Sequence, residues 1–200
     1  MHLRELKIPD AYEVTPKQLA DDRGVFLEWY RFDRLEETLG YSLDLRQANT
    51  SVSAQGVVRG IHFADVPPSQ AKYVTLASGA AIDYIVDLRV GSPTFGTWDS
   101  VLLDTVDRRA VYISEGLGHC FVALQPGTTV NYLVSQVYAP NVEHGVNPLD
   151  PDIALALPTD IGELLLSPKD TGAPGLHEAV ELGILPTWDE ARAYYDSLRQ

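Results

Sequence analysis

Residues 56–63 read GVVRGIHF, and this stretch belongs to the series of strand-like runs that decides the fold. It places Arg59 and His62 in an apolar run rich in β-branched residues, which is typical of a strand. A lone histidine in such a run is usually a packed core residue. A buried guanidinium, however, requires an anionic partner, and Lys72 adds a further cation in the next strand-like run, residues 70–76. Together the three side chains predict a pocket for an anionic substrate with an acidic C–H bond.

Short strand-like runs follow one another along most of the chain. They lie at 25–30, 45–53, 56–63, 71–77, 80–89, 97–103, 110–113, 119–124 and 129–137. Turn signals separate them and no helices alternate with them, so the pattern predicts an all-β barrel or sandwich. Short helices are expected at 34–39 and, after a capping box at 187–190, through about residue 198. The last helix is expected to pack outside the barrel or on a partner subunit.

The run 45–53 alternates strictly between two faces. Gln47, Asn49, Ser51 and Ser53 share one of them. This polar face is either the solvent side of a strand or a wet barrel interior that binds a ligand.

Composition limits the class of protein. A chain of 200 residues fits a single domain that needs neither disulfide nor metal for stability, and its one cysteine, Cys120, indicates a reducing compartment. Without a signal core or spanning segment, the chain is expected to be soluble and cytoplasmic, with no membrane partner. The net charge of −13 argues against nucleic acid as a partner.

Two kinds of chemistry fit the sequence poorly. A metal-binding barrel of this sort needs two histidines one residue apart, and none of the five histidines has that spacing, so no metal site is expected. Cys120 is expected to be a buried structural residue on the strand face opposite to His119. No nucleophile elbow or phosphate-binding glycine loop is present in the sequence.

Proton transfer remains. A histidine side chain titrates near neutral pH, so His62 could remove a proton next to a carbonyl group. Lys72 could stabilise the resulting enolate oxygen. The acid that reprotonates the opposite face could be a tyrosine, and Tyr132 and Tyr138 are candidates, although a tyrosine in a strand usually packs in a core or an interface.

Several motifs between residues 8 and 172 resemble, in order and without large gaps, the dTDP-4-dehydrorhamnose 3,5-epimerase family. They are DRGVF at 22–26, QAN at 47–49, RGIH at 59–62, QAK at 70–72, VDLR at 86–89, GSPTFGTW at 91–98, EGLGH at 115–119 and LSPKD at 166–170. The resemblance implies a cupin-type jelly roll, a homodimer, no metal or other cofactor, and a dTDP-linked 4-keto-6-deoxyhexose as substrate. Residues from about 173 to 200 would form a C-terminal extension of one domain spanning residues 1–200.

The resemblance also implies a role for each matching residue. His62 would be the base, oriented by Asp170, while Tyr132 would be the acid and Lys72 the enolate stabiliser. Tyr138 would stack on the thymine ring. The remaining substrate-binding residues would be Arg23, Phe26 and Glu28, reaching across from the partner subunit, with Gln47, Asn49, Arg59, His119, Glu143 and Lys169.

Some positions depart from the family pattern. Ala64 stands where glutamine is usual, Leu133 where lysine is usual, and residues 147, 148 and 157 where aromatic residues are common. These changes leave the acid, base and lysine untouched, so the open question is which carbons are inverted. They favour a relative that works on an unusual deoxysugar, as in antibiotic-sugar pathways, with inversion at carbon 3 alone as one outcome.

Three other functions remain possible for such a barrel. A sugar-nucleotide 3,4-ketoisomerase would want a second histidine in the pocket, for which His119 is the candidate. A non-catalytic sugar-nucleotide binding module would not need the full set His62, Lys72, Tyr132 and Asp170. A metal-dependent cupin oxygenase would contain stoichiometric metal.

Overall fold

The computed structural model describes residues 1–199, and strands account for most of its regular structure. They are β1 (His2–Glu5), β2 (Ala11–Thr15), β3 (Gln18–Asp21), β4 (Gly24–Leu27), β5 (Gln47–Ser53), β6 (Val58–Ala64), β7 (Lys72–Ser78), β8 (Ala80–Asp87), β9 (Trp98–Asp104), β10 (Ala110–Ile113), β11 (Leu117–Ala123), β12 (Thr128–Val134) and β13 (Glu143–Gly145). The helices are α1 (Phe32–Leu39), α2 (Pro168–Thr171), α3 (Leu176–Glu181) and α4 (Trp188–Leu198). The predicted all-β architecture is confirmed.

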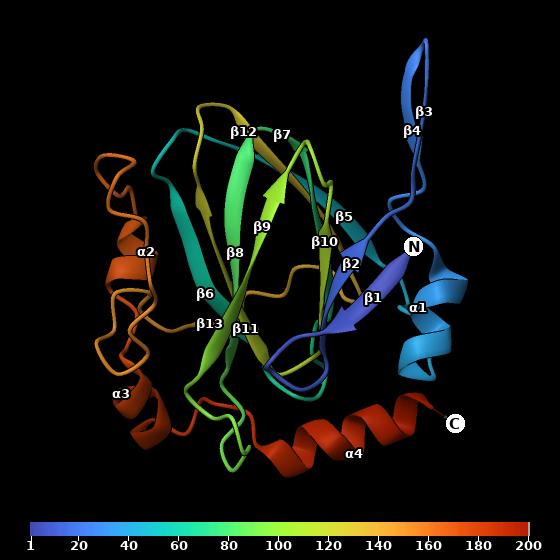
Figure 1. Cartoon of the computed structure of the whole chain (residues 1–200). Coiled ribbons are helices and arrows are strands. Elements are labelled where there is room, and N and C mark those ends of the chain that lie inside the picture. The colour runs from blue at the N-terminus through green and yellow to red at the C-terminus, as the bar shows by residue number, and fades with distance from the viewer. Residues whose placement is uncertain (200) are drawn as a thin grey trace.

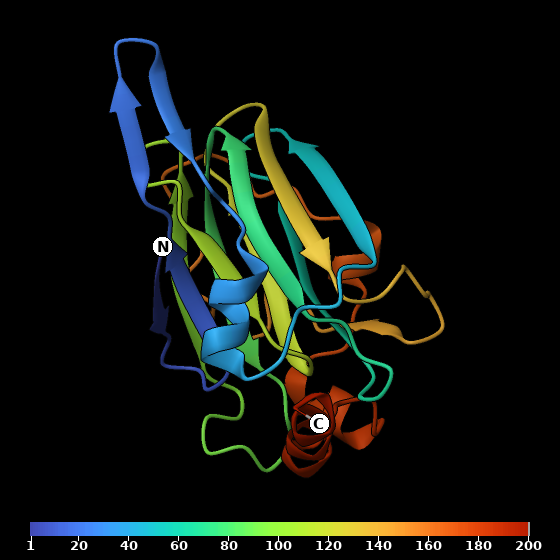
Figure 2. The ribbon, with the colours of Figure 1, turned by 90° about the vertical axis from the view of Figure 1, so that its right-hand side faces the viewer.

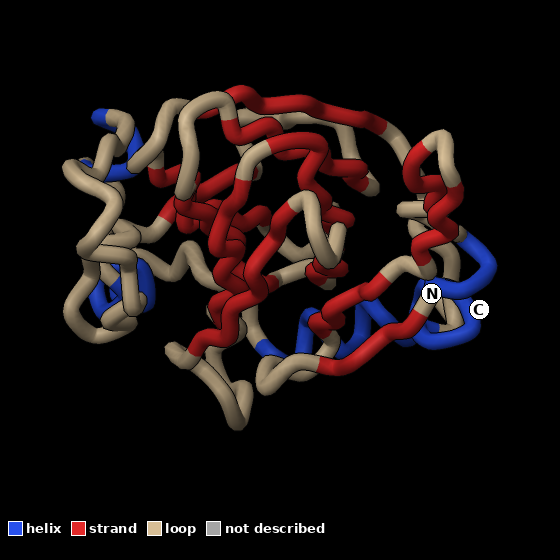
Figure 3. The backbone as a smooth tube through the Cα atoms, turned by 45° about the horizontal axis from the view of Figure 1, so that its top comes forward, coloured by secondary structure: helices blue, strands red, loops and turns tan. Residues whose placement is uncertain are grey.

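Two antiparallel sheets face each other and form the barrel (Figure 1). One has the strand order β1-β2-β10-β7-β12-β5 and the other the order β13-β6-β11-β8-β9. The helices lie at the periphery of the strands (Figure 3). The edge strands β5 and β13 belong to different sheets, so one side of the barrel is not closed by backbone hydrogen bonds between the sheets.

Apolar side chains fill the space between the sheets and also cover their outer faces. The interior cluster includes Val74 and Leu76 from β7 with Ile85 from β8. A second cluster packs β6, β8 and β11 against the segment that carries α3, and a third packs β7 and β10 against α1. Burial on both faces explains why β11 is buried along its whole length and why its sequence does not alternate like that of β5.

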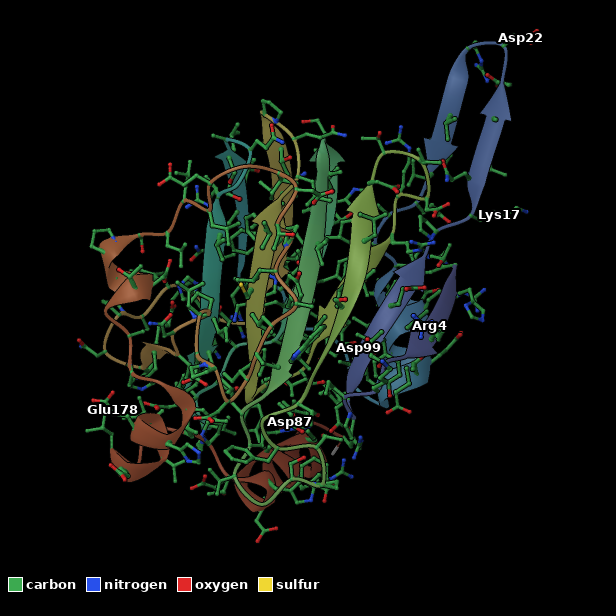
Figure 4. All side chains as sticks on the ribbon, turned by 60° about the vertical axis from the view of Figure 1, so that its left-hand side comes forward. Arg4, Lys17, Asp22, Asp87, Asp99 and Glu178 are labelled. Atoms are coloured by element: carbon green, nitrogen blue, oxygen red, sulfur yellow. The ribbon has the colours of Figure 1, made fainter. Side chains whose placement is uncertain are left out.

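The hairpin of β3 and β4 projects from the barrel (Figures 1 and 2). Lys17 lies at its base and Asp22 near its tip (Figure 4). Its side chains are largely exposed, and that of Phe26 is 66 % exposed. A hairpin with large apolar side chains in solvent is typical of a segment that contacts a partner.

The helix at the C-terminus agrees closely with its prediction. The side chain of Thr187 accepts a hydrogen bond from the backbone of Glu190, and the side chain of Glu190 accepts one from the backbone of Thr187, so the capping box is present. α4 lies across the lower end of the barrel (Figures 1 and 2). The helix expected at 34–39 begins two residues earlier, at Phe32, and ends before Gly40, whose φ of 79° is left-handed.

Other boundaries were predicted wrongly. The strand expected at 25–30 ends at Leu27, and the one expected at 129–137 ends at Val134. The sequence did not indicate β1, β2, β3, β13, α2 or α3, which are short and lack a clear period. No helix among residues 1–199 combines the length and hydrophobicity needed to cross a membrane.

Candidate active site

A pocket of about 670 Å³ opens between the two sheets, at the side of the barrel where β5 and β13 are the edges. A volume of this size suits a ligand larger than a simple sugar. Most of the predicted site residues line it. They are Gln47, Asn49, Arg59, His62, Lys72, His119, Tyr132, Tyr138, Glu143, Lys169 and Asp170.

The other three predicted site residues lie elsewhere in the chain. Arg23, Phe26 and Glu28 are on or next to the projecting hairpin and do not line the pocket. Arg23 instead pairs with Asp21, and Glu28 pairs with Arg31. One chain alone therefore does not bring these residues to the site.

His62 lies on β6, and its Nε2 is 2.7 Å from Oδ1 of Asp170. Asp170 is 6 % exposed. Ser167 caps the N-terminus of α2, and its hydroxyl donates a 2.8 Å hydrogen bond to Oδ2 of Asp170. The two oxygens of Asp170 thus have separate partners, which fixes the orientation of the imidazole.

Asp170 stays ionised in this setting. Burial opposes its charge, but the hydrogen bond and charge of His62, with the hydroxyl of Ser167, outweigh burial and hold the pKa of Asp170 below its usual value. The carboxylate can therefore stabilise a protonated imidazole, and His62 is equipped to accept a proton.

Lys72 begins β7 in the opposite sheet and is 8 % exposed. Burial lowers its pKa to about 8, against the opposing charges of Glu143 and Glu115. A dry ammonium in a pocket interacts strongly with a nearby oxyanion because little water screens it.

Tyr132 lies on β12, also in the sheet opposite to His62. It is half-buried against the interior core. Burial raises the pKa of its phenol, while the charge of Arg59 opposes this shift and that of Glu143 adds to it. The phenol thus keeps its proton at neutral pH and can donate it.

The polar face of β5 is directed into the barrel and not to solvent, and two of its residues, Gln47 and Asn49, line the pocket. Ala48, Thr50 and Val52 are exposed, whereas the alternate residues are not. Gln47 donates a 2.7 Å hydrogen bond to Asn49 and accepts one from the backbone of Tyr138. The ring of Tyr138, 59 % exposed, stands beside the pocket.

Two more histidines line the pocket, and each has a carboxylate partner. Nε2 of His119 is 2.8 Å from Oδ2 of the fully buried Asp83, and Nε2 of His144 is 2.7 Å from Oδ1 of Asp65. His119 is paired with His62 across β11 and β6. Gly60 permits this close approach, because a Cβ atom there would lie 2.4 Å from the carbonyl oxygen of His119.

Sequence reasoning missed Ser167, Asp83 and Asp65 as partners of the pocket residues. The S-x-x-D spacing of Ser167 and Asp170 is a helix-start signal that could have revealed the first. Cys120 is fully buried, as predicted. In the described part of the chain, no group of three His, Cys, Asp or Glu side chains is arranged to hold a metal ion.

Comparison with known proteins identifies the fold and the family of relatives. The family model described as dTDP-4-dehydrorhamnose 3,5-epimerase matches residues 5–178. The dTDP-4-dehydrorhamnose 3,5-epimerase of Mycolicibacterium smegmatis is 54 % identical over 200 residues, covering 100 % of this chain and 98 % of that protein. A dTDP-4-dehydrorhamnose 3-epimerase of Streptomyces niveus is 56 % identical over 193 residues, and the match covers 96 % of this chain and 92 % of that protein.

A solved structure agrees over the whole chain. The structure of an epimerase of Mycobacterium tuberculosis superposes with a TM-score of 0.97 at 48 % identity and covers 100 % of both chains. This match confirms the cupin-type jelly roll.

Proposed function

Because the chain belongs to the dTDP-4-dehydrorhamnose 3,5-epimerase family, we propose that its pocket removes a proton from one face of a sugar and returns one to the other. The chain is an isomerase that epimerises a dTDP-linked 4-keto-6-deoxyhexose at carbon 3, carbon 5 or both. The roles of individual residues are our proposal. The observation that carries them is the pair of His62 and Asp170, 2.7 Å apart, in a pocket whose opposite sheet supplies Lys72 and Tyr132.

The reaction begins at a carbon next to the ketone. The 4-keto group acidifies the C–H bonds of carbons 3 and 5. Because Nε2 of His62 donates its hydrogen to the carboxylate of Asp170, Nδ1 of the neutral imidazole is the atom that can take such a proton. His62 takes the proton and becomes an imidazolium that Asp170 stabilises. Ser167 supports this step indirectly by holding the carboxylate.

The electrons of the broken C–H bond move onto the ketone oxygen and form an enolate. The ammonium of Lys72 stabilises this oxygen, and its low exposure strengthens the interaction. Tyr132 then donates its phenolic proton to the same carbon from the opposite face, which inverts the configuration. After product release the imidazolium of His62 gives up its proton to solvent and the tyrosinate takes one from solvent, which restores both groups.

The nucleotide occupies the wetter part of the pocket. Arg59 neutralises diphosphate oxygens and is itself positioned by its 3.2 Å hydrogen bond to Ser53. Gln47 fixes the backbone of Tyr138, whose exposed ring stacks on thymine. Asn49, His119, Glu143 and Lys169 supply further polar contacts from the lining.

We propose that the protein works as a homodimer whose hairpins complete the pockets. Arg23, Phe26 and Glu28 are absent from the pocket of their own chain, and the hairpin exposes apolar side chains. Insertion of this hairpin into the partner's site would bury Phe26 and add a cation next to the diphosphate. Light scattering in solution measures the subunit number directly.

The function is tested by incubating the protein with dTDP-4-keto-6-deoxyglucose in heavy water and following the sugar by NMR. Each carbon that His62 deprotonates acquires deuterium, so label at carbon 3, carbon 5 or both gives the regiochemistry. Sequence identity does not decide which carbons are inverted, because the relative at 54 % identity is named a 3,5-epimerase and the relative at 56 % a 3-epimerase. A product with the ketone at carbon 3 would show a ketoisomerase, and no incorporation would contradict the proposal.

A further inference from the structure

One buried carboxyl group near the site has no role in the scheme above. Glu115 lies in the turn between β10 and β11, and the residue is 3 % exposed. Its Oε2 atom has no hydrogen-bond partner within residues 1–199. A buried carboxyl with an unpaired oxygen costs stability, so its presence calls for an explanation.

Strand register places the turn that carries Glu115 next to the start of β7, where Lys72 lies. Ile113, two residues before Glu115, is paired with Lys72 across β10 and β7. The charges of the two groups act on each other: Glu115 raises the pKa of Lys72, and Lys72 lowers that of Glu115. The charge of Glu115 thus acts on Lys72 from the turn between β10 and β11, whereas that of Glu143, which has the larger effect, acts from β13 on the pocket side.

The C-terminal helix closes this end of the barrel. Tyr195 of α4 donates a short hydrogen bond to the backbone carbonyl of Glu115. Arg89, fully buried, donates to Asp87, Asp10 and the hydroxyl of Tyr195, which fastens α4 to the barrel. Asp87 and α4 are adjacent at the lower end of the molecule in Figure 4. α4 therefore shields Glu115 from water.

Lys72 is the cation whose charge lowers the pKa of Glu115, and the other titratable groups around Glu115 are neutral or paired elsewhere. Tyrosine hydroxyls face it from three elements: Tyr41 after α1, Tyr112 on β10, and Tyr194 and Tyr195 on α4. Burial raises the pKa of all four phenols, so they are neutral. Two further charged groups lie near Glu115, and both have other partners: Arg89, next to Gly116, is paired with Asp87 and Asp10, and Asp10 is also paired with Arg192.

We propose that Glu115 is a positioning residue for the epimerase reaction: from the sealed end of the barrel, its carboxylate keeps Lys72 in the ammonium form that stabilises the enolate. This inference rests on the role proposed for Lys72. Burial disfavours the ammonium, and a fixed negative charge that water cannot screen offsets that penalty.

The ionisation states of the two groups are compatible with this role. Burial raises the pKa of Glu115 to about 7, and burial lowers that of Lys72 to about 8. Carboxylate and ammonium therefore coexist around neutral pH. Removing the carboxylate takes away an effect that raises the pKa of Lys72, so the ammonium should be lost at a lower pH.

The test measures Lys72 directly, without relying on catalysis. Brief labelling with acetic anhydride at a series of pH values, followed by peptide mass spectrometry, reports the protonation midpoint of each amine. Lys7 and Lys17 serve as internal references in the same sample. For Glu115→Gln we expect the midpoint of Lys72 to fall by about one pH unit, with those of Lys7 and Lys17 unchanged.

Matched variants separate charge from packing. Glu115→Asp keeps the charge and should retain the wild-type midpoint, and Glu181→Gln makes the same chemical change on the exposed face of α3 and should have no effect. If Glu115→Gln does not fold, Glu115→Met removes the charge with a side chain suited to a dry site. An unchanged midpoint in a folded, charge-free variant would overturn the proposal.

The pH profile of deuterium exchange then links this effect to the reaction. In Glu115→Gln the alkaline limb should move to lower pH together with the labelling midpoint. A shifted midpoint with an unmoved limb would overturn the link to the enolate. Absence of exchange in the wild-type protein would instead contradict the proposed function, while the labelling result would still stand.

Discussion

At the scale of single residues, the site depends on groups whose protonation is set by burial and by partners. His62 and Ser167 keep Asp170 ionised, and burial keeps Tyr132 protonated. Burial also lowers the pKa of Lys72 to about 8, close to neutral pH. The shifts of Asp170 and Tyr132 favour the forms that the reaction requires near neutral pH, whereas the shift of Lys72 works against its ammonium. The chemistry therefore follows from where the barrel places these side chains.

Lys72 gives a prediction for pH dependence. Burial lowers its pKa to about 8, so the ammonium is lost as the pH rises through that value, well below the usual range for lysine. We expect the rate of deuterium exchange under saturating substrate to fall above about pH 8, about tenfold for each further unit. A rate that stays constant to about pH 10 would show that the ammonium is not needed.

The pocket residues were more predictable from the sequence than the side chains that pair with them. Eleven of the fourteen predicted site residues, chosen largely through the family motifs, line the pocket, whereas His144 lines it without having been predicted. Asp83 and Asp65 were missed as partners of His119 and His144 because each pair is distant in sequence and forms only when strands meet. No local pattern encodes such a pair.

At the scale of elements, the short helix α2 connects stability with catalysis. Its N-cap, Ser167, accepts a hydrogen bond from the backbone N–H of Asp170 and donates one to the carboxylate of the same residue. One hydroxyl thus holds both the helix end and the partner of His62.

Ser167→Ala should therefore have two effects. Loss of the cap should lower the free energy of unfolding by about 1 kcal/mol, and a less ordered Asp170 should lower kcat by about tenfold. Thr187→Ala is the matched control, because it removes the corresponding cap of α4, outside the pocket. Denaturation curves should show similar destabilisation in the two variants. Exchange rates should show a loss of kcat in Ser167→Ala alone. Equal losses of kcat in both variants would contradict the proposed role of Ser167.

Element boundaries were predictable where a local signal exists. The capping box located the start of α4, and the alternation of β5 revealed its two faces. The choice between solvent and pocket for the polar face required the opposite sheet, which sequence periodicity does not show. β13 has three residues, too few for a sequence period, and it is a strand because it pairs with β6.

At the scale of the whole molecule, the pocket of one chain lacks the hairpin residues that the family resemblance assigns to it. Arg23 and Phe26 are on the projecting hairpin (Figure 2), far along the chain from the catalytic set. The family resemblance predicts that the hairpin of a partner subunit supplies them. Homodimerisation and a cytoplasmic location both remain predictions.

Complementation between two inactive variants tests the shared site. A chain with His62→Asn keeps a normal hairpin, and a chain with both Arg23→Ala and Phe26→Ala keeps a normal catalytic set. Random exchange of subunits gives half mixed dimers with one complete site each, so we expect about a quarter of wild-type activity. Activity no greater than that of the separate variants would contradict a hairpin that serves the partner.

The central claim is that His62 and Tyr132 act on opposite faces of the sugar, and the fate of deuterium in Tyr132→Phe tests it most directly. NMR in heavy water separates exchange with retention from exchange with inversion. With His62→Asn as the control that loses both, we expect Tyr132→Phe to retain substantial exchange and to lose inversion by about 100-fold. Equal loss of exchange and inversion in Tyr132→Phe would contradict a separate acid and, with it, the two-face mechanism.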